Sequence, residues 1–114
     1  MKVERFDIWL ADLNPRFGTE AGKTRPVLVV QSDLLNKVHP STIICPITTN
    51  IKKGANILRV DIKKGEGGTQ RDSSVMIDQI RAIDNKRFTK KIGRLPEYLQ
   101  DKVVANVKVI LEIA

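Results

Sequence analysis

Short apolar segments separated by polar, turn-rich stretches limit the fold of this chain more than any other feature of its sequence. Their length and spacing predict strands of a small, mostly antiparallel sheet or barrel. The expected strands run from Phe6 to Leu10, Val27 to Val30, Thr42 to Ile47, Ile57 to Ile62, Ser74 to Ile77 and Gln79 to Ile83. Because Pro26 directly precedes the run Val27 to Val30, we expect that buried strand to begin after the proline.

The last part of the chain has a different periodicity. Beyond Pro96, a residue favoured at the start of a helix, apolar side chains recur at helical intervals, at Leu99, Val103, Val107 and Ile110 or Leu111. This pattern predicts an amphipathic helix over Glu97 to Glu112 that covers one face of the sheet. The expected fold class is therefore mainly β, with one C-terminal helix.

Length and charge limit the function classes. A chain of 114 residues fits one domain whose core needs no disulfide bonds. Its 20 Lys and Arg residues against 13 Asp and Glu residues give a net charge of +7, which favours a nucleic-acid or other anionic partner. Cys45 is the only cysteine, and charged residues interrupt the N-terminal segment, so we expect a cytoplasmic protein without a signal peptide or a membrane contact.

The segment Phe17 to Val30 contains Gly22-Lys23-Thr24, which looks like the end of a phosphate-binding loop. The P-loop pattern has four residues between its two glycines, whereas only Thr19, Glu20 and Ala21 separate Gly18 from Gly22. The pattern also needs a helix after the Lys-Thr pair. A strand is predicted here instead. The sequence therefore disfavours a nucleotide-hydrolysing enzyme of the P-loop class.

Cofactor chemistry has few candidate residues in this chain. His39 is the only histidine, which excludes a histidine-pair nuclease within one chain and a His-rich metal site. No serine lies in a nucleophile-elbow motif, and no acidic pair has two-metal spacing. Any catalysis is expected to proceed with no metal and no organic cofactor.

Polar residues that adjoin the aliphatic strands remain as candidates. Arg25 precedes a buried run, Thr48 and Thr49 end another, and Asp78-Gln79 with Arg81 interrupt a third. Composition alone allows a structural explanation, in which Arg25 pairs with Asp78 or another acid and the threonines simply favour strands. Loops rich in Gly and Lys also bring cations close to strand ends, where an extended polyanion could bind: Lys52, Lys53, Lys63, Lys64 and Arg71.

The order of these segments is more specific than any one of them. The chain contains, in this order, Asp12-Leu13-Asn14-Pro15, Gly18-Thr19-Glu20, Arg25-Pro26-Val27-Leu28-Val29, Pro46-Ile47-Thr48 and Asp78-Gln79-Ile80-Arg81. Over nearly its whole length it resembles the MazF/PemK family of toxin–antitoxin ribonucleases. The resemblance implies a single toxin domain over residues 1–114, with a small SH3-like (CcdB/PemK-type) β-barrel and a C-terminal helix.

The resemblance also implies an activity. Family members are homodimers that cut single-stranded RNA at short sequence motifs without metal, through attack of the 2′-hydroxyl on the adjacent phosphorus. The products carry a 2′,3′-cyclic phosphate and a 5′-hydroxyl. An acidic antitoxin protein inhibits the toxin, and operator DNA is bound only indirectly, through the toxin–antitoxin complex.

The same resemblance implies roles for individual residues. Arg25 and Thr48 would donate hydrogen bonds to the reacting phosphate, and Asp78 would accept the proton or orient Arg25. We expect RNA contacts from Phe17, Thr19, Glu20, Lys23, Thr49, Lys52, Lys53, Gln79 and Arg81. The chain departs from some relatives at Thr19, where they have histidine, and at Met76, where they have arginine, so their acid–base assignment does not transfer as a whole.

Two other functions remain open from the sequence. CcdB-type toxins share the fold and bind DNA gyrase without catalysis, but they use a C-terminal Trp-Gly-Ile, whereas this chain ends Leu111-Glu112-Ile113-Ala114 and has its only tryptophan at Trp9. A basic SH3-like RNA-binding module without activity would require purely structural roles for Arg25 and Thr48.

Overall fold

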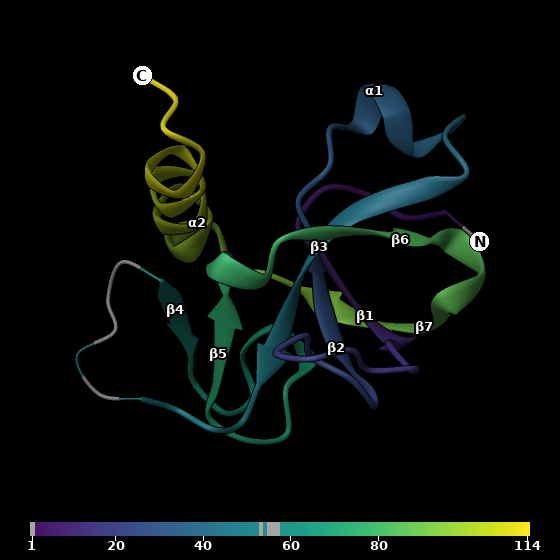
Figure 1. Cartoon of the computed structure of the whole chain (residues 1–114). Coiled ribbons are helices and arrows are strands. Elements are labelled where there is room, and N and C mark those ends of the chain that lie inside the picture. The colour runs from purple at the N-terminus through teal and green to yellow at the C-terminus, as the bar shows by residue number, and fades with distance from the viewer. Residues whose placement is uncertain (1, 53, 55–57) are drawn as a thin grey trace.

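The computed structural model describes residues 2–52, 54 and 58–114 of the chain. Within this part, a seven-stranded sheet is followed by a C-terminal helix (Figure 1). The strands are β1 (Asp7–Asp12), β2 (Thr24–Val29), β3 (Ser41–Thr48), β4 (Arg59–Ile62), β5 (Ser73–Met76), β6 (Arg81–Asp84) and β7 (Phe88–Arg94). The helices are α1 (Asp33–Asn36) and α2 (Glu97–Leu111), and three 3₁₀ turns are η1 (Glu66–Gly68), η2 (Ile77–Gln79) and η3 (Asn85–Arg87).

All the strand pairs are antiparallel, in the order β4-β5-β3-β2-β1-β7, and β6 pairs with β3. The long strand β3 is shared among three neighbours. Its first residues pair with β6, its middle residues pair with β2, and Ile47 and Thr48 pair with β5. This sharing curves the sheet into the small barrel that the sequence predicts.

Side chains on the two sides of β2 belong to two apolar cores. The helix-covered core includes Ile8 and Leu28 from the sheet and Leu99 and Val103 from α2. The opposite core is built from Val3, Trp9, Ala11, Leu13, Ala21, Val27, Val29, Ile44, Met76, Ile83 and Phe88. Leu99 and Val103 are the predicted helical positions, so the amphipathic helix and its cover over one sheet face are confirmed.

Strand β2 begins earlier than the sequence predicts. It runs from Thr24, and Pro26 lies within it opposite Leu10 of β1, so the prediction that the strand begins after the proline is wrong. The ladder to β3 begins only at Val27, which leaves Pro26 with a neighbouring strand on one side alone. Such an edge position tolerates a residue that lacks an N–H group.

Other boundaries also differ from expectation. Gln79 lies in turn η2 and not in a strand, because a 3₁₀ turn separates β5 from β6, which begins at Arg81. The start of the predicted strand at Ile57 lies outside the described residues, and β4 begins at Arg59. Strand β7 was missed because it is a polar edge strand in which only Phe88 is buried.

Across residues 2–52, 54 and 58–114, no helix has the length and apolar character needed to cross a membrane.

Candidate active site

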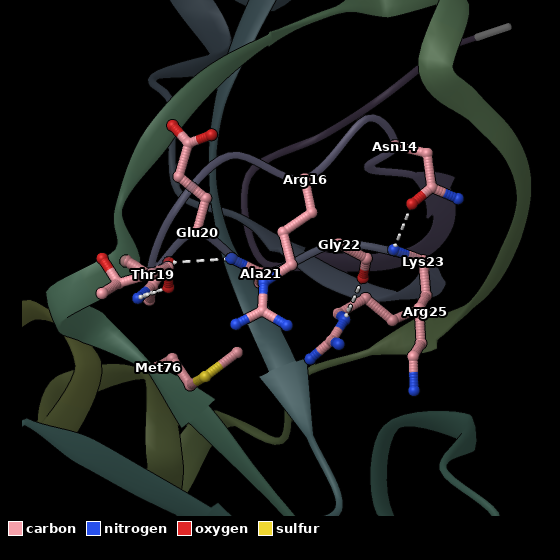
Figure 2. Close-up of a pocket in the computed structure, with 10 residues that line it drawn as sticks. Asn14, Arg16, Thr19, Glu20, Ala21, Gly22, Lys23, Arg25 and Met76 are labelled. Atoms are coloured by element: carbon pink, nitrogen blue, oxygen red, sulfur yellow. Dashed lines mark hydrogen bonds between the residues drawn. The ribbon is translucent and has the colours of Figure 1, made fainter.

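The loop between β1 and β2 encloses a pocket of about 220 Å³ where the first strand ends and the second begins. The residues that line it are Asn14, Arg16, Thr19, Glu20, Ala21, Gly22, Lys23, Arg25, Met76 and Gln79 (Figure 2). Ala21 and Met76 also belong to the opposite core, so the pocket borders a packed apolar region. Its other walls are mostly polar, with three cations, Arg16, Lys23 and Arg25, and one carboxylate, Glu20.

Hydrogen bonds fix the loop that forms this pocket. The Leu13 amide donates to the Lys23 carbonyl at 2.9 Å, and the Lys23 amide donates to the Asn14 side-chain oxygen at 2.9 Å. The Gln79 side chain joins the loop to turn η2, because it accepts from the Ala21 amide and donates to the Thr19 carbonyl, each at 3.1 Å. The loop is therefore held at both ends and in its middle.

Arg25 is half-buried at the start of β2, with its backbone fixed by pairing to Ala11. Its Nε donates to the Gly22 carbonyl at 2.8 Å, which orients the guanidinium in the pocket. Burial, and then the positive charge of Arg16, lowers the pKa of Arg25 from its usual value. Both ion pairs found within the described residues use Asp7, so no Arg25–Asp78 pair is present there.

Arg16 is a site residue that the sequence analysis missed. Its guanidinium and that of Arg25 extend into the same space, whereas the Glu20 carboxylate points away from them (Figure 2). Arg16 Nε donates to the Gly18 carbonyl at 3.2 Å. Gly22 makes room for this arrangement, since a Cβ there would lie 2.7 Å from Arg16 Cβ. Two neighbouring guanidinium groups form a site suited to an anion such as phosphate.

Thr48 is related to Arg25 through the strand register. Val27 lies opposite Pro46, and extending this register by two residues would place Thr48 opposite Arg25, on the same face of the sheet. Thr48 does not line the pocket, and its hydroxyl accepts from the Asn50 amide at 3.1 Å.

Asp78 is exposed and lies outside the pocket lining. Cys45 belongs to the helix-covered core, and its burial raises the pKa of its thiol to about 12. The negative charge of Asp78 makes a smaller contribution in the same direction. Among the described residues, Glu20 is therefore the only carboxylate that lines the pocket. No group of three His, Cys, Asp or Glu side chains in this part of the chain could hold a metal ion.

The expected RNA-binding residues divide into several groups. Thr19, Glu20, Lys23 and Gln79 line the pocket with Arg25. Phe17 belongs to the same loop and is 82% exposed, so its ring is free to contact a base. The other residues lie outside this pocket. Thr49 lines a second groove, and Lys52 is exposed after the end of β3. Arg81 is half-buried on β6, and its Nη1 is buried without a hydrogen-bond partner among the described residues. Lys53 lies outside the described residues.

Comparisons with known proteins agree with this geometry. Residues 4–111 match the family described as PemK-like, MazF-like toxin of type II toxin-antitoxin system. The Endoribonuclease EndoA of Bacillus subtilis (strain 168) is 40% identical over 113 residues, which cover 99% of this chain and 97% of that protein.

Solved structures share the fold. The crystal structure of MazF from Deinococcus radiodurans has a TM-score of 0.84 at 22% identity and covers 98% of each chain. A mycobacterial endoribonuclease in complex with its cognate antitoxin has a TM-score of 0.80 at 14% identity and covers 98% of this chain and 97% of that one. The barrel fold that the sequence resemblance implied is thereby confirmed.

Proposed function

This chain belongs to the PemK-like, MazF-like family of type II toxin–antitoxin toxins, and from that premise we propose that it is an endoribonuclease that an antitoxin neutralises. Its substrate is single-stranded RNA, and its reaction uses no metal. The observation that carries this proposal is the pair of guanidinium groups, Arg16 and Arg25, in the pocket between β1 and β2. The domain proposed for this activity spans residues 1–114.

The proposed reaction is an internal transfer at phosphorus. The RNA 2′-oxygen bonds to the adjacent phosphorus while the bond from phosphorus to the 5′-oxygen breaks, which leaves a 2′,3′-cyclic phosphate and a 5′-hydroxyl. A base takes the proton of the 2′-hydroxyl, and the leaving oxygen receives a proton. DNA lacks the nucleophile, so it is not a substrate.

Charge that develops on the phosphoryl oxygens needs fixed donors. Arg25 supplies them, because its Nε bond to the Gly22 carbonyl leaves the two terminal nitrogens of the guanidinium for the phosphate. Arg16 adds a second cation from the loop. Thr48, on the same face of the sheet, contributes a neutral hydroxyl donor.

The proton acceptor is a carboxylate, because arginine keeps its proton in proteins. Asp78 is the candidate that the sequence suggests, and Glu20 is the carboxylate that lines the pocket. The Glu20 carboxylate points away from the two guanidinium groups, and Asp78 lies outside the pocket lining, so substitution of each residue is needed to separate the two assignments. Phe17, Thr19, Lys23 and Gln79 then bind the nucleotides around the reacting phosphate.

We also propose that the toxin acts as a homodimer in the cytoplasm. A groove of about 260 Å³ near α2 has a mostly apolar lining, and Leu35, Ile43 and Leu111 in it are 44%, 39% and 50% exposed. Apolar exposure of this kind supports a second copy as its cover. An acidic antitoxin suits the net charge of +7, and operator DNA is reached only through that antitoxin.

Incubation of the purified protein with unstructured RNA in EDTA tests the function. We expect cleavage, which neither a gyrase-binding toxin nor a passive RNA-binding module would produce. Intact RNA after prolonged incubation with a folded protein would contradict the proposal. The structure offers no support for gyrase binding, since Trp9 is buried and its indole donates to Asp7 at 3.3 Å.

A further inference from the structure

A second groove, of about 370 Å³, lies on the other face of β2 from the Arg25 pocket. Leu10 forms part of its floor, and this residue pairs with Pro26 on one side and with Lys90 on the other. Ile92, which packs against the helix-covered core, completes the apolar part of the lining. The rim carries polar and cationic side chains, among them Thr49, Arg71 and Lys90.

Neighbouring residues at the start of β2 line the two cavities. Arg25 and Pro26 are neighbours in β2, and successive side chains of a strand point to opposite faces. One therefore lines the first pocket and the other lines the second groove. At the neighbouring strand end, Thr48 is the last residue of β3, and Thr49 directly follows it and lines the second groove. A strand of RNA that passes around this end of the sheet reaches both cavities.

Close backbone contacts fix the wall of the groove. A Cβ on Gly68 would lie 2.0 Å from the Ile92 carbonyl oxygen, and one on Gly93 would lie 2.1 Å from the Gly67 carbonyl oxygen. The buried Thr69 hydroxyl donates to the Glu66 carbonyl at 2.8 Å. The segment that carries Arg71 is thus packed directly on β7, and the groove is preformed.

The charge of the groove indicates its ligand. Arg71 and Lys90 are exposed, neither takes part in an ion pair found within the described residues, and no carboxylate is among the lining residues. Two free cations beside hydroxyl groups suit a phosphate, and the apolar floor of Leu10, Pro26 and Ile92 suits the face of a base.

We propose that this groove binds a nucleotide of the RNA substrate that flanks the cleaved one, with its phosphate on Arg71 and Lys90 and its base over Pro26. The proposal rests on the proposed ribonuclease function. It extends the binding site beyond the pocket to the opposite face of the sheet, so RNA length contributes to affinity. Short substrates that fill only the Arg25 pocket do not contact this groove.

The test compares the double variant Arg71→Gln/Lys90→Gln with a control of equal charge, Lys37→Gln/Lys102→Gln, whose lysines are exposed and do not line this groove. The probe is a fully 2′-O-methylated copy of an RNA that the wild type cleaves, titrated at several salt concentrations. Each lost phosphate contact lowers the salt slope for a single strand by about 0.7. For the double variant we expect the salt slope to fall by about 1.4 and the RNA affinity at 0.1 M salt to fall about 25-fold. Near 1 M salt its affinity should approach that of the wild type.

The outcomes separate this proposal from the proposed function. If the wild type cleaves RNA and the double variant keeps wild-type affinity and salt slope, the groove proposal is overturned and the ribonuclease stands. Weakened binding of a poly-glutamate peptide with unchanged RNA affinity would assign the groove to an acidic protein segment and would also overturn it. If the wild type does not cleave RNA, the proposed function itself fails. Thermal melting of all variants shows whether each is folded.

Discussion

Replacement of Arg25 by alanine should remove most of the cleavage activity and leave the fold intact. Within the part of the chain that the structure describes, this side chain makes one hydrogen bond, from Nε to the Gly22 carbonyl at 2.8 Å. It takes part in neither of the ion pairs within the described residues, so its loss leaves no buried charge unpaired there. The expected loss of stability is about 0.5 to 1.5 kcal/mol, the value of an ordinary hydrogen bond.

The expected loss of activity is much larger. A preorganised donor to charge that develops in the transition state is worth about 3 to 4 kcal/mol, which corresponds to roughly a hundredfold to a thousandfold in rate. Arg25→Lys should recover little, because an ammonium group cannot reproduce both the Nε bond to Gly22 and the two-pronged phosphate contact.

The assay is single-turnover cleavage of a short RNA in EDTA, with circular dichroism and thermal melting on the same samples. Lys86→Ala serves as the control, since Lys86 is exposed and lines neither the pocket nor the groove near α2. Near-wild-type cleavage by a folded Arg25→Ala protein would refute the assigned role. Loss of the fold would show instead that Arg25 is structural.

Other substitutions test the remaining parts of the site. Thr48→Val should slow cleavage about tenfold without unfolding, as expected for one neutral hydrogen bond, and unchanged single-turnover rates would remove its hydroxyl from the mechanism. Glu20→Gln and Asp78→Asn separate the two candidates for the base: the variant that lacks the base should lose at least about a hundredfold in single-turnover rate while the other stays near wild type, and near-wild-type rates for both would exclude either carboxylate as the base. Gly22→Ala should slow cleavage at least tenfold, because its Cβ would lie 2.7 Å from Arg16 Cβ; in an Arg25→Ala background the same change should add little. Cys45, fully buried with its thiol pKa raised to about 12, should resist iodoacetamide at pH 8 until the protein unfolds; immediate labelling would contradict that burial.

Periodicity was a good guide to the core of this fold and a poor one to its edges. The helical repeat at Leu99 and Val103 predicted α2 because both side chains are buried against the sheet. Strand β7 gave no comparable signal, since an edge strand can be polar on both faces. Pro26 was misjudged because a proline is excluded only where both neighbouring strands are present, and here one is missing.

The candidate site was predictable only where sequence neighbours stay neighbours in space. Thr19, Glu20, Lys23 and Arg25 belong to one loop and the strand that follows it, and all of them line the pocket. Arg16 lies in the same loop, but its approach to Arg25 depends on the path of the chain and on the absence of a side chain at Gly22.

The relation between Arg25 and Thr48 depends on the register of β2 against β3, which no local pattern encodes. The same holds for Gln79, whose side chain meets the loop across 58 positions of the sequence. Contacts between distant segments of this kind could come only from the resemblance or from the structure.

The most direct test of the central claim is the fate of one RNA and of its copy with a single 2′-deoxynucleotide on the 5′ side of the cut. Both are incubated with the wild type in EDTA, and the product ends are identified by mass spectrometry. The account predicts a 2′,3′-cyclic phosphate and a 5′-hydroxyl from the RNA and no cut at the deoxy position. A 3′-hydroxyl with a 5′-phosphate, or efficient cleavage of the deoxy copy at the same position, would contradict attack by the 2′-hydroxyl.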